Sequence, residues 1–244
     1  LRMSRGLGDV YKRQGNIYDG YRNRIMIPIR DKFRRIIGFT ARDCSGDKSA
    51  AKYINSNESD IYHKQDSIFG IDTAIRQAAK DDKFYLVEGA PDAMQLKRIR
   101  VNNAVAPLGG AWTESQMEQF KKYATKVCFL PDADPPNFEK GEKLGAGIRN
   151  TMRNGLLAMK SGLGVSVKEL PLGEAQSKND PDTYCTSIQK FQELKEVDFI
   201  PWYAQHIFQD VNTTEERSDA INTISAMVVI CLLYTSPSPR DMRR

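Results

Sequence analysis

Hydrophobic and polar positions alternate with two different periods along this chain. Between residues 24 and 42, two short runs of alternating apolar and polar residues flank Asp31 and Lys32, a pattern typical of a β-hairpin. From residue 71 to residue 170, short apolar runs that predict strands alternate with stretches of helical spacing. The expected strands cover residues 84–87, 104–107, 126–130 and 165–170, and the expected helices cover residues 71–80, 92–99, 114–123 and 144–159. This alternation predicts an α/β fold in which helices flank a parallel, doubly wound sheet.

The last part of the chain has a helical pattern. Ile188, Phe191, Leu194 and Val197 recur at helical spacing, and residues 215–229 form a second such stretch. We therefore expect residues 185–230 to form a separate helical subdomain.

Composition narrows the class of protein. The chain has 244 residues, 40% of them hydrophobic, which suits one large or two small globular domains. No apolar run approaches the roughly 20 residues of a membrane helix, so we expect no contact with a membrane. The four cysteines are scattered and there are only two histidines, which argues against a zinc site in this fragment. Without a signal peptide or a disulfide framework, we expect a reducing, cytoplasmic compartment.

The net charge of +5 lies in the two ends of the chain. Residues 9–14 and 231–235 can be encoded by complementary strands of one DNA, and the complementarity continues outward on both sides. We interpret residues 1–14 and 231–244 as adapter-derived tails on an internal fragment. Without them the chain has 29 basic and 29 acidic residues, because the tails hold 7 of the 36 basic and 2 of the 31 acidic ones. The neutral remainder is polarised: residues 15–64 hold ten Lys or Arg against six acids.

Acidic residues follow several of the predicted strands. Glu88 follows the strand at 84–87, Asp132 and Asp134 follow the strand at 126–130, and Asp180 and Asp182 lie in the loop after the strand at 165–170. Since ligands of open parallel sheets bind beyond the carboxyl ends of the strands, we expect these acids to converge. Hard oxygen ligands of this kind suit Mg²⁺ or Mn²⁺. Each acid taken alone is also a common helix N-cap, and Asp92 in particular fits the first turn of a helix.

These motifs resemble a known family. Glu88 and Gly89 after a hydrophobic strand, followed by the D-x-D of Asp132 and Asp134, are similar to the Toprim domain of bacterial-type primases, topoisomerases and some nucleases. The flanking segments are similar, in order, to the catalytic core of bacterial and phage replicative DNA primases: YRNRIMIPIRD, GFTAR, AKYINSNESDIYHK, VEGAPDAM, APLGGAWT and NDPDTY. The resemblance covers most of residues 16–184.

The resemblance implies an enzyme that makes short RNA primers for DNA replication by metal-assisted nucleotidyl transfer. Its implied partners are a single-stranded DNA template, ribonucleoside triphosphates and, through parts outside this segment, a replicative helicase. Glu88, Asp132 and Asp134 would be catalytic, either as ligands of Mg²⁺ or Mn²⁺ or, for Glu88, as a general base, with Asp180 and Asp182 as further ligands. The residues implied in nucleic-acid or nucleotide binding are Arg24, Lys52, Asn55, Lys64 and Asp92. Tyr53 and Tyr62 offer either stacking faces or packing.

Two other functions stay open on the residues alone. The chain is compatible with a Toprim nuclease of a phage or mobile element, or with a Toprim module that binds nucleic acid without polymerising. Pro135, Pro136 and an inserted NFEKGEKLG depart from the family pattern after the D-x-D, which leaves the geometry of Asp134 open. The expected parts are a partial basic α+β subdomain, a Toprim domain and a truncated helical subdomain, at residues 15–80, 81–184 and 185–230.

Overall fold

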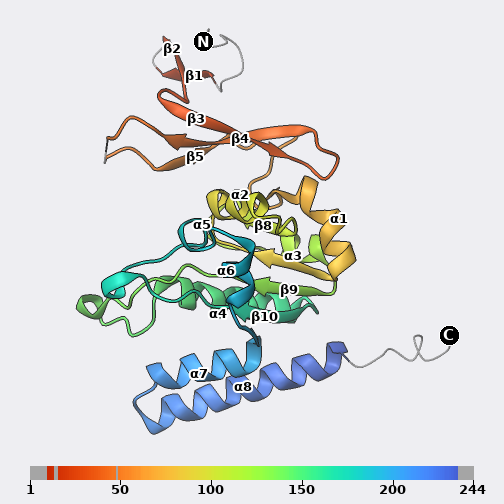
Figure 1. Ribbon diagram of the computed structural model, residues 1–244, viewed down its shortest axis with the longest axis vertical. Helices are drawn as coiled ribbons and strands as arrows, with labels where there is room; N and C mark the ends of the chain where they lie inside the picture. Colours follow the sequence, from red (N-terminus) through yellow and green to blue (C-terminus); the bar gives the residue numbers. More distant parts are fainter. Residues whose placement is uncertain (1–9, 14–15, 48, 236–244) are drawn as a thin grey trace, which may run out of the picture.

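A computed structural model describes residues 10–13, 16–47 and 49–235, which form three layers of structure (Figure 1). A small antiparallel sheet lies at one end, a larger sheet with its helices occupies the middle, and a pair of helices forms the other end. Most of residues 1–14, and residues 236–244 of the second predicted tail, lie outside the described part of the chain.

The middle layer is a six-stranded sheet with the strand order β11-β10-β9-β7-β8-β6. The four central strands run parallel to one another, and both edge strands are antiparallel to their neighbours. The strands are β6 (Ile68–Phe69), β7 (Lys83–Leu86), β8 (Ala104–Pro107), β9 (Lys126–Phe129), β10 (Gly164–Lys168) and β11 (Glu196–Asp198). The predicted α/β class and parallel sheet are confirmed, and the four central strands lie within two residues of their expected bounds.

Helices cover both faces of this sheet. The core on one face includes Phe84, Phe120 and Ala158, and it lies beneath α1 (Ile71–Asp81), α3 (Glu114–Phe120) and α4 (Ala146–Lys160). The core on the other face includes Val87 and Leu96, and it lies beneath α2 (Ala90–Arg98), α5 (Pro181–Tyr184) and α6 (Ile188–Glu193). Phe84 and Val87 reach opposite cores because successive side chains of a strand point to opposite faces.

The first layer is built from short antiparallel strands. β3 (Arg24–Arg30) pairs with β4 (Ile36–Asp43), as the alternation predicted, and β4 pairs with β5 (Tyr53–Asn55). Asp31 closes the hairpin, because its carboxylate accepts hydrogen bonds from the backbone N–H groups of Phe33 and Arg35, both at 2.9 Å. A separate two-stranded ribbon precedes it, formed by β1 (Val10–Arg13) and β2 (Asn16–Asp19).

The final segment differs from the expected helix over Ile188 to Val197. α6 ends at Glu193, and Val197 instead pairs with Val167 in β11, at the edge of the large sheet. Glu196 fixes this edge strand, because its carboxylate accepts from Lys83 Nζ and Ser166 Oγ, both at 2.6 Å. The chain then forms α7 (Phe199–Asp210) and α8 (Thr214–Thr235), which lie side by side in Figure 1.

None of the described helices combines the length and the apolar character needed to cross a membrane. The subdomain boundaries at residues 80 and 184 stay predictions. α1 packs against β7 and β8 of the large sheet.

Candidate active site

The acidic residues lie beyond the carboxyl ends of the parallel strands. Glu88 lies two residues after β7, and Asp132 lies three residues after β9, the strand that pairs with β7. The loop after β10 is longer and contains the short 3-10 helix Glu174–Gln176 before it returns to this edge at Asp180. The sheet topology alone therefore brings three separate segments to one edge.

A two-residue antiparallel bridge joins two of these segments. The backbone N–H of Ala133 donates to the carbonyl of Asn179 at 2.8 Å, and the N–H of Asn179 donates to the carbonyl of Ala133 at 3.0 Å. In such a bridge the residues on either side of the paired ones face each other on one side of the ladder. This register sets four charged side chains on one face, as the pairs Asp132 with Asp180 and Asp134 with Lys178.

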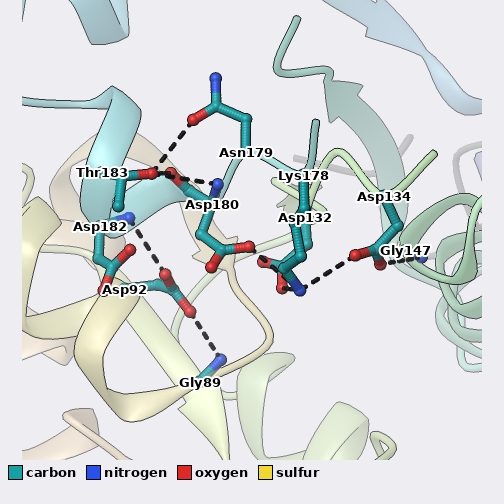
Figure 2. Close-up of polar contacts among 10 residues, drawn as sticks. All are labelled: Gly89, Asp92, Asp132, Asp134, Gly147, Lys178, Asn179, Asp180, Asp182 and Thr183. Atoms are coloured by element: carbon teal, nitrogen blue, oxygen red, sulfur yellow. Dashed lines mark hydrogen bonds and ion pairs between the residues drawn. The ribbon is translucent and has the colours of Figure 1, made fainter. Parts of the chain in front are cut away.

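The ammonium group of Lys178 lies among three carboxylates (Figure 2). Its Nζ is 2.7 Å from Asp132 Oδ2, 3.0 Å from Asp134 Oδ1 and 3.1 Å from Asp180 Oδ1. Burial would lower the pKa of Lys178, but its hydrogen bonds to Asp132 and Asp134 outweigh that effect and raise the pKa well above its usual value. Lys178 is therefore charged at any physiological pH. The sequence contained no signal for its position, because nothing in SKNDPD predicts a strand-like bridge.

The N-terminus of α4 completes the surroundings of Asp134. The backbone N–H of Gly147 donates to Asp134 Oδ2 at 3.1 Å, so the positive end of the helix dipole faces this carboxylate. A Cβ at Gly145 would lie 1.9 Å from the carbonyl oxygen of Asp134, and a Cβ at Gly147 would lie 2.2 Å from that of Asp132. Only glycine allows so close an approach. The insertion after Pro136 extends outward, with Phe138 exposed, and it leaves this contact in place.

Asp92 connects two other segments of the site. It is 7% exposed, and its carboxylate accepts from the backbone N–H of Gly89 and from that of Asp182, both at 3.1 Å (Figure 2). The first bond belongs to a capping box at the start of α2, as the N-cap interpretation anticipated, and the second ties α5 to α2. Burial, with the nearby charges of Asp132 and Asp182, raises the pKa of Asp92 to about 7.

Glu88 and Asp132 have perturbed acidities. Burial, with the negative charges of Asp132 and Asp134, raises the pKa of Glu88 to about 7. Burial also raises the pKa of Asp132, to about 6, although the Lys178 ammonium acts against that rise. Such acids hold their protons more tightly than free carboxylates because the ionised forms repel one another in a partly dry site.

The unsatisfied oxygens of the site test its fit to a metal ion. Glu88 Oε1, Asp132 Oδ1 and Asp182 Oδ1 are buried and accept no hydrogen bond from any residue that the structure describes. A divalent cation with a preference for oxygen would satisfy such atoms. In the described part of the chain, however, no three acidic, His or Cys side chains are assembled into a metal-holding group. The donor chemistry fits Mg²⁺ or Mn²⁺, and Lys178 lies among three of the donors.

The basic residues proposed for nucleic-acid binding have different surroundings. Arg24 is committed within the small sheet, because its Nη1 donates to the carbonyl of Ala51 at 2.7 Å and its Nη2 lies 3.8 Å from Asp43. Lys52 is exposed on the segment that leads into β5.

Asn55 and Lys64 lie against the large sheet. The side-chain amide of Asn55 donates to the carbonyl of Leu108, just after β8. The side chain of Lys64 lies beside Gly109, which follows Leu108 in the loop after β8: a Cβ at Gly109 would be 3.5 Å from Lys64 Cε. Since β8 neighbours β7, the structure brings both residues to the edge of the sheet that carries Glu88.

The two tyrosines considered for base stacking, Tyr62 and Tyr53, differ in their burial. Tyr62 is fully buried against Gly38, and burial raises its pKa to about 12, so it packs within the core and has no face for stacking. Tyr53 is half-buried; its pKa is raised by burial, and it interacts electrostatically with Arg42, Asp182 and Asp92. The hydroxyl of Tyr53, on β5, therefore lies near two acids of the site.

Two family models match the chain. "DNA primase catalytic core, N-terminal domain" matches residues 3–75, and "Toprim-like" matches residues 85–185. The first match starts within the predicted tail at 1–14, whose origin stays a prediction.

Relatives and solved structures agree with these matches. The chain is 31% identical to a DNA primase of Clostridium acetobutylicum over 215 residues, which cover 86% of this chain and 33% of the relative. The chain thus spans about a third of that relative's length. A structure of the Aquifex aeolicus primase, with its zinc-binding and RNA polymerase domains, matches with a TM-score of 0.70 at 25% identity. The match covers 96% of this chain and 53% of the Aquifex chain. A primase catalytic domain solved with single-stranded DNA matches with a TM-score of 0.69 at 24% identity. This match covers 92% of this chain and 71% of the solved chain.

Proposed function

This chain belongs to the family of bacterial-type DNA primase catalytic cores, and from that premise we propose that its parent protein synthesises short RNA primers on single-stranded DNA. The observation that carries this proposal is the cluster of carboxylates at the edge of the sheet. Asp132, Asp134 and Asp180 each place an oxygen within 3.1 Å of the Lys178 ammonium, and Glu88 lies nearby. Transfer of a nucleotide to a primer 3′ oxygen needs such concentrated negative charge to hold divalent ions against a triphosphate.

The metal-binding role falls to acidic residues of this edge. Toprim domains generally bind Mg²⁺, and the ligands that we propose are Glu88, Asp132, Asp134, Asp180 and Asp182. When bound, a divalent ion supplies positive charge that stabilises the phosphates and activates the attacking oxygen. The α4 N-terminus holds Asp134 in place, and Asp92 positions the backbone of Gly89 and Asp182.

Glu88 has the acidity expected of a proton acceptor. A pKa of about 7 lets it take a proton near neutral pH and release it again, which suits general base catalysis. Its buried Oε1, which accepts no hydrogen bond from the part of the chain that the structure describes, equally suits a metal ligand. Both roles require the ionised form.

The nucleic-acid and nucleotide partners would bind between the small sheet and the acidic edge. Lys64 lies beside Gly109, where its ammonium can neutralise a phosphate of the incoming ribonucleotide, and Asn55 anchors β5 to the same loop. Exposed Lys52 would contact the backbone of the template. A related catalytic domain has been solved with single-stranded DNA, which supports this class of partner. We infer a replicative helicase as a further partner, through parts of the parent protein outside this chain.

The test uses the full-length parent with a single-stranded template, ribonucleotides and Mg²⁺. We expect Asp132→Asn to abolish primer synthesis, while Asp219→Asn, which removes the same charge from exposed α8, preserves it. Synthesis that persists in Asp132→Asn would refute the catalytic assignment. Template cleavage without primer synthesis would instead identify a nuclease, and template binding without either reaction would identify a passive module.

A further inference from the structure

We propose that Lys178 is a built-in counter-ion of the acidic cluster, which holds the cluster together in the metal-free protein and has to leave before a divalent ion binds there. This inference rests on the proposed metal-binding function of the cluster. It assigns to Lys178 a role in controlling the entry of the metal ion.

The first support is the register of the backbone bridge. Lys178 and Asp180 flank Asn179, and the two hydrogen bonds between Asn179 and Ala133 fix which face their side chains occupy. A register one residue away would turn Lys178 to the opposite face. The same backbone contact therefore assembles the three carboxylates and supplies the cation that neutralises one of their charges.

The second support is the contrast in exposure between the lysine and its partners. The side chain of Lys178 is 47% exposed, whereas those of Asp132, Asp134 and Asp180 are 11%, 18% and 32% exposed. The acids are held by the packed sheet edge and by the N-terminus of α4, and the lysine has open solvent beside it. Lys178 can consequently swing out while the carboxylates keep their places.

The third support is the geometry around the ammonium. Its Nζ lies 2.7, 3.0 and 3.1 Å from one oxygen each of Asp132, Asp134 and Asp180. A Mg²⁺ ion binds its oxygen ligands at about 2.1 Å, so an ion at the centre of these oxygens would overlap with the ammonium. The two cations exclude each other, and each one relieves the same repulsion between carboxylates.

Competition lowers the apparent affinity for the metal. When the binding-competent state is populated for only a fraction of the time, the apparent dissociation constant rises by the inverse of that fraction. Lys178→Met removes the competitor and keeps most of the aliphatic chain. We expect this variant of the present chain to bind Mn²⁺ on the order of tenfold more tightly than the wild type.

The experiment is a Mn²⁺ titration of this chain followed by electron paramagnetic resonance, which measures free Mn²⁺ and requires no catalysis. Lys195→Met removes an exposed lysine between α6 and β11 and should leave the affinity unchanged. Lys178→Arg keeps the positive charge and should retain weak, wild-type-like binding. Thermal unfolding in EDTA should show Lys178→Met less stable than the wild type, and saturating Mn²⁺ should remove the difference.

Each result separates the two levels of inference. Unchanged or weaker Mn²⁺ binding in a folded Lys178→Met would overturn the counter-ion role while leaving the metal site intact. If Lys178→Met folds only with Mn²⁺, the role is supported, because the metal then replaces the missing charge. If it folds under neither condition, Lys178→Gln takes its place with the same expectation. Failure of both the wild type and the folded variants to bind Mn²⁺ would refute the metal site, and with it the proposed function.

Discussion

A methyl group at Gly147 is expected to disturb the acidic cluster although no acidic residue is replaced. Gly147 lies in the first turn of α4, and its backbone N–H donates to Asp134 Oδ2. In Gly147→Ala the new Cβ would lie 2.2 Å from the carbonyl oxygen of Asp132 and 3.1 Å from Glu88 Oε1. The first contact is with backbone, so the clash cannot be relieved by rotation of a side chain.

The size of the effect follows from the overlap. Cβ atoms essentially never approach a heavy atom closer than 3.0 Å, so α4 and the Asp132 loop must separate by about 1 Å. Overpacking of this kind costs about 1–3 kcal/mol, and the better helix propensity of alanine returns about 1 kcal/mol. We expect a net destabilisation of about 0–2 kcal/mol, which lowers Tm by at most roughly 8 °C in a chain of this length.

The same displacement should affect function far more than stability. A misplacement of about 1 Å can cost on the order of 100-fold in rate, so primer synthesis by the full-length parent should fall by that order. Gly155→Ala is the matched control on the same helix: its Cβ would also lie 2.2 Å from a neighbour, but that neighbour is the ring of Phe199, away from the acids. It should lower Tm and retain activity. Wild-type activity in Gly147→Ala, or equal losses in both variants, would refute this reasoning.

Three further predictions concern stability. Because the folded-state pKa values of Glu88 and Asp92, about 7, exceed their ordinary values of 4.5 and 3.8, the stability that their protonated forms contribute is present at low pH and lost as pH rises. In EDTA, Tm should thus fall from pH 5.5 to 8, and less steeply in Glu88→Gln; identical slopes would contradict this. Phe84→Ala empties a fully buried site whose ring centroid lies 4.7 Å from that of Phe120, and urea unfolding should show a loss of about 3–5 kcal/mol. Thr113→Ala removes the N-cap of α3 and a 2.7 Å bond to the carbonyl of Gln65, at a cost of about 1 kcal/mol or more that Thr113→Ser should largely restore.

The fold was predictable where local pattern and tertiary burial agree. Strands 104–107 and 126–130 are short apolar runs between helices, and both are central strands of the large sheet, as expected. Val197 shows the opposite case. Its spacing from Phe191 and Leu194 favours a helix, but pairing with Val167 at the open edge of the sheet prevails. Edge pairing depends on what the rest of the chain leaves uncovered, and no local window contains that information.

Part of the candidate site was likewise predictable from local pattern, and part depends on tertiary contacts. Strand topology requires Glu88 and Asp132 to meet at one edge, so their proximity could be inferred before any coordinates. The contact of Lys178 with the cluster depends on a two-residue bridge formed by Asn179, in a segment with neither helical nor strand periodicity. A lysine two positions before an aspartate is compatible with many arrangements, and only the register with Ala133 selects this one. Sequence therefore locates the negative charge of the site, whereas the tertiary structure determines which cation neutralises it.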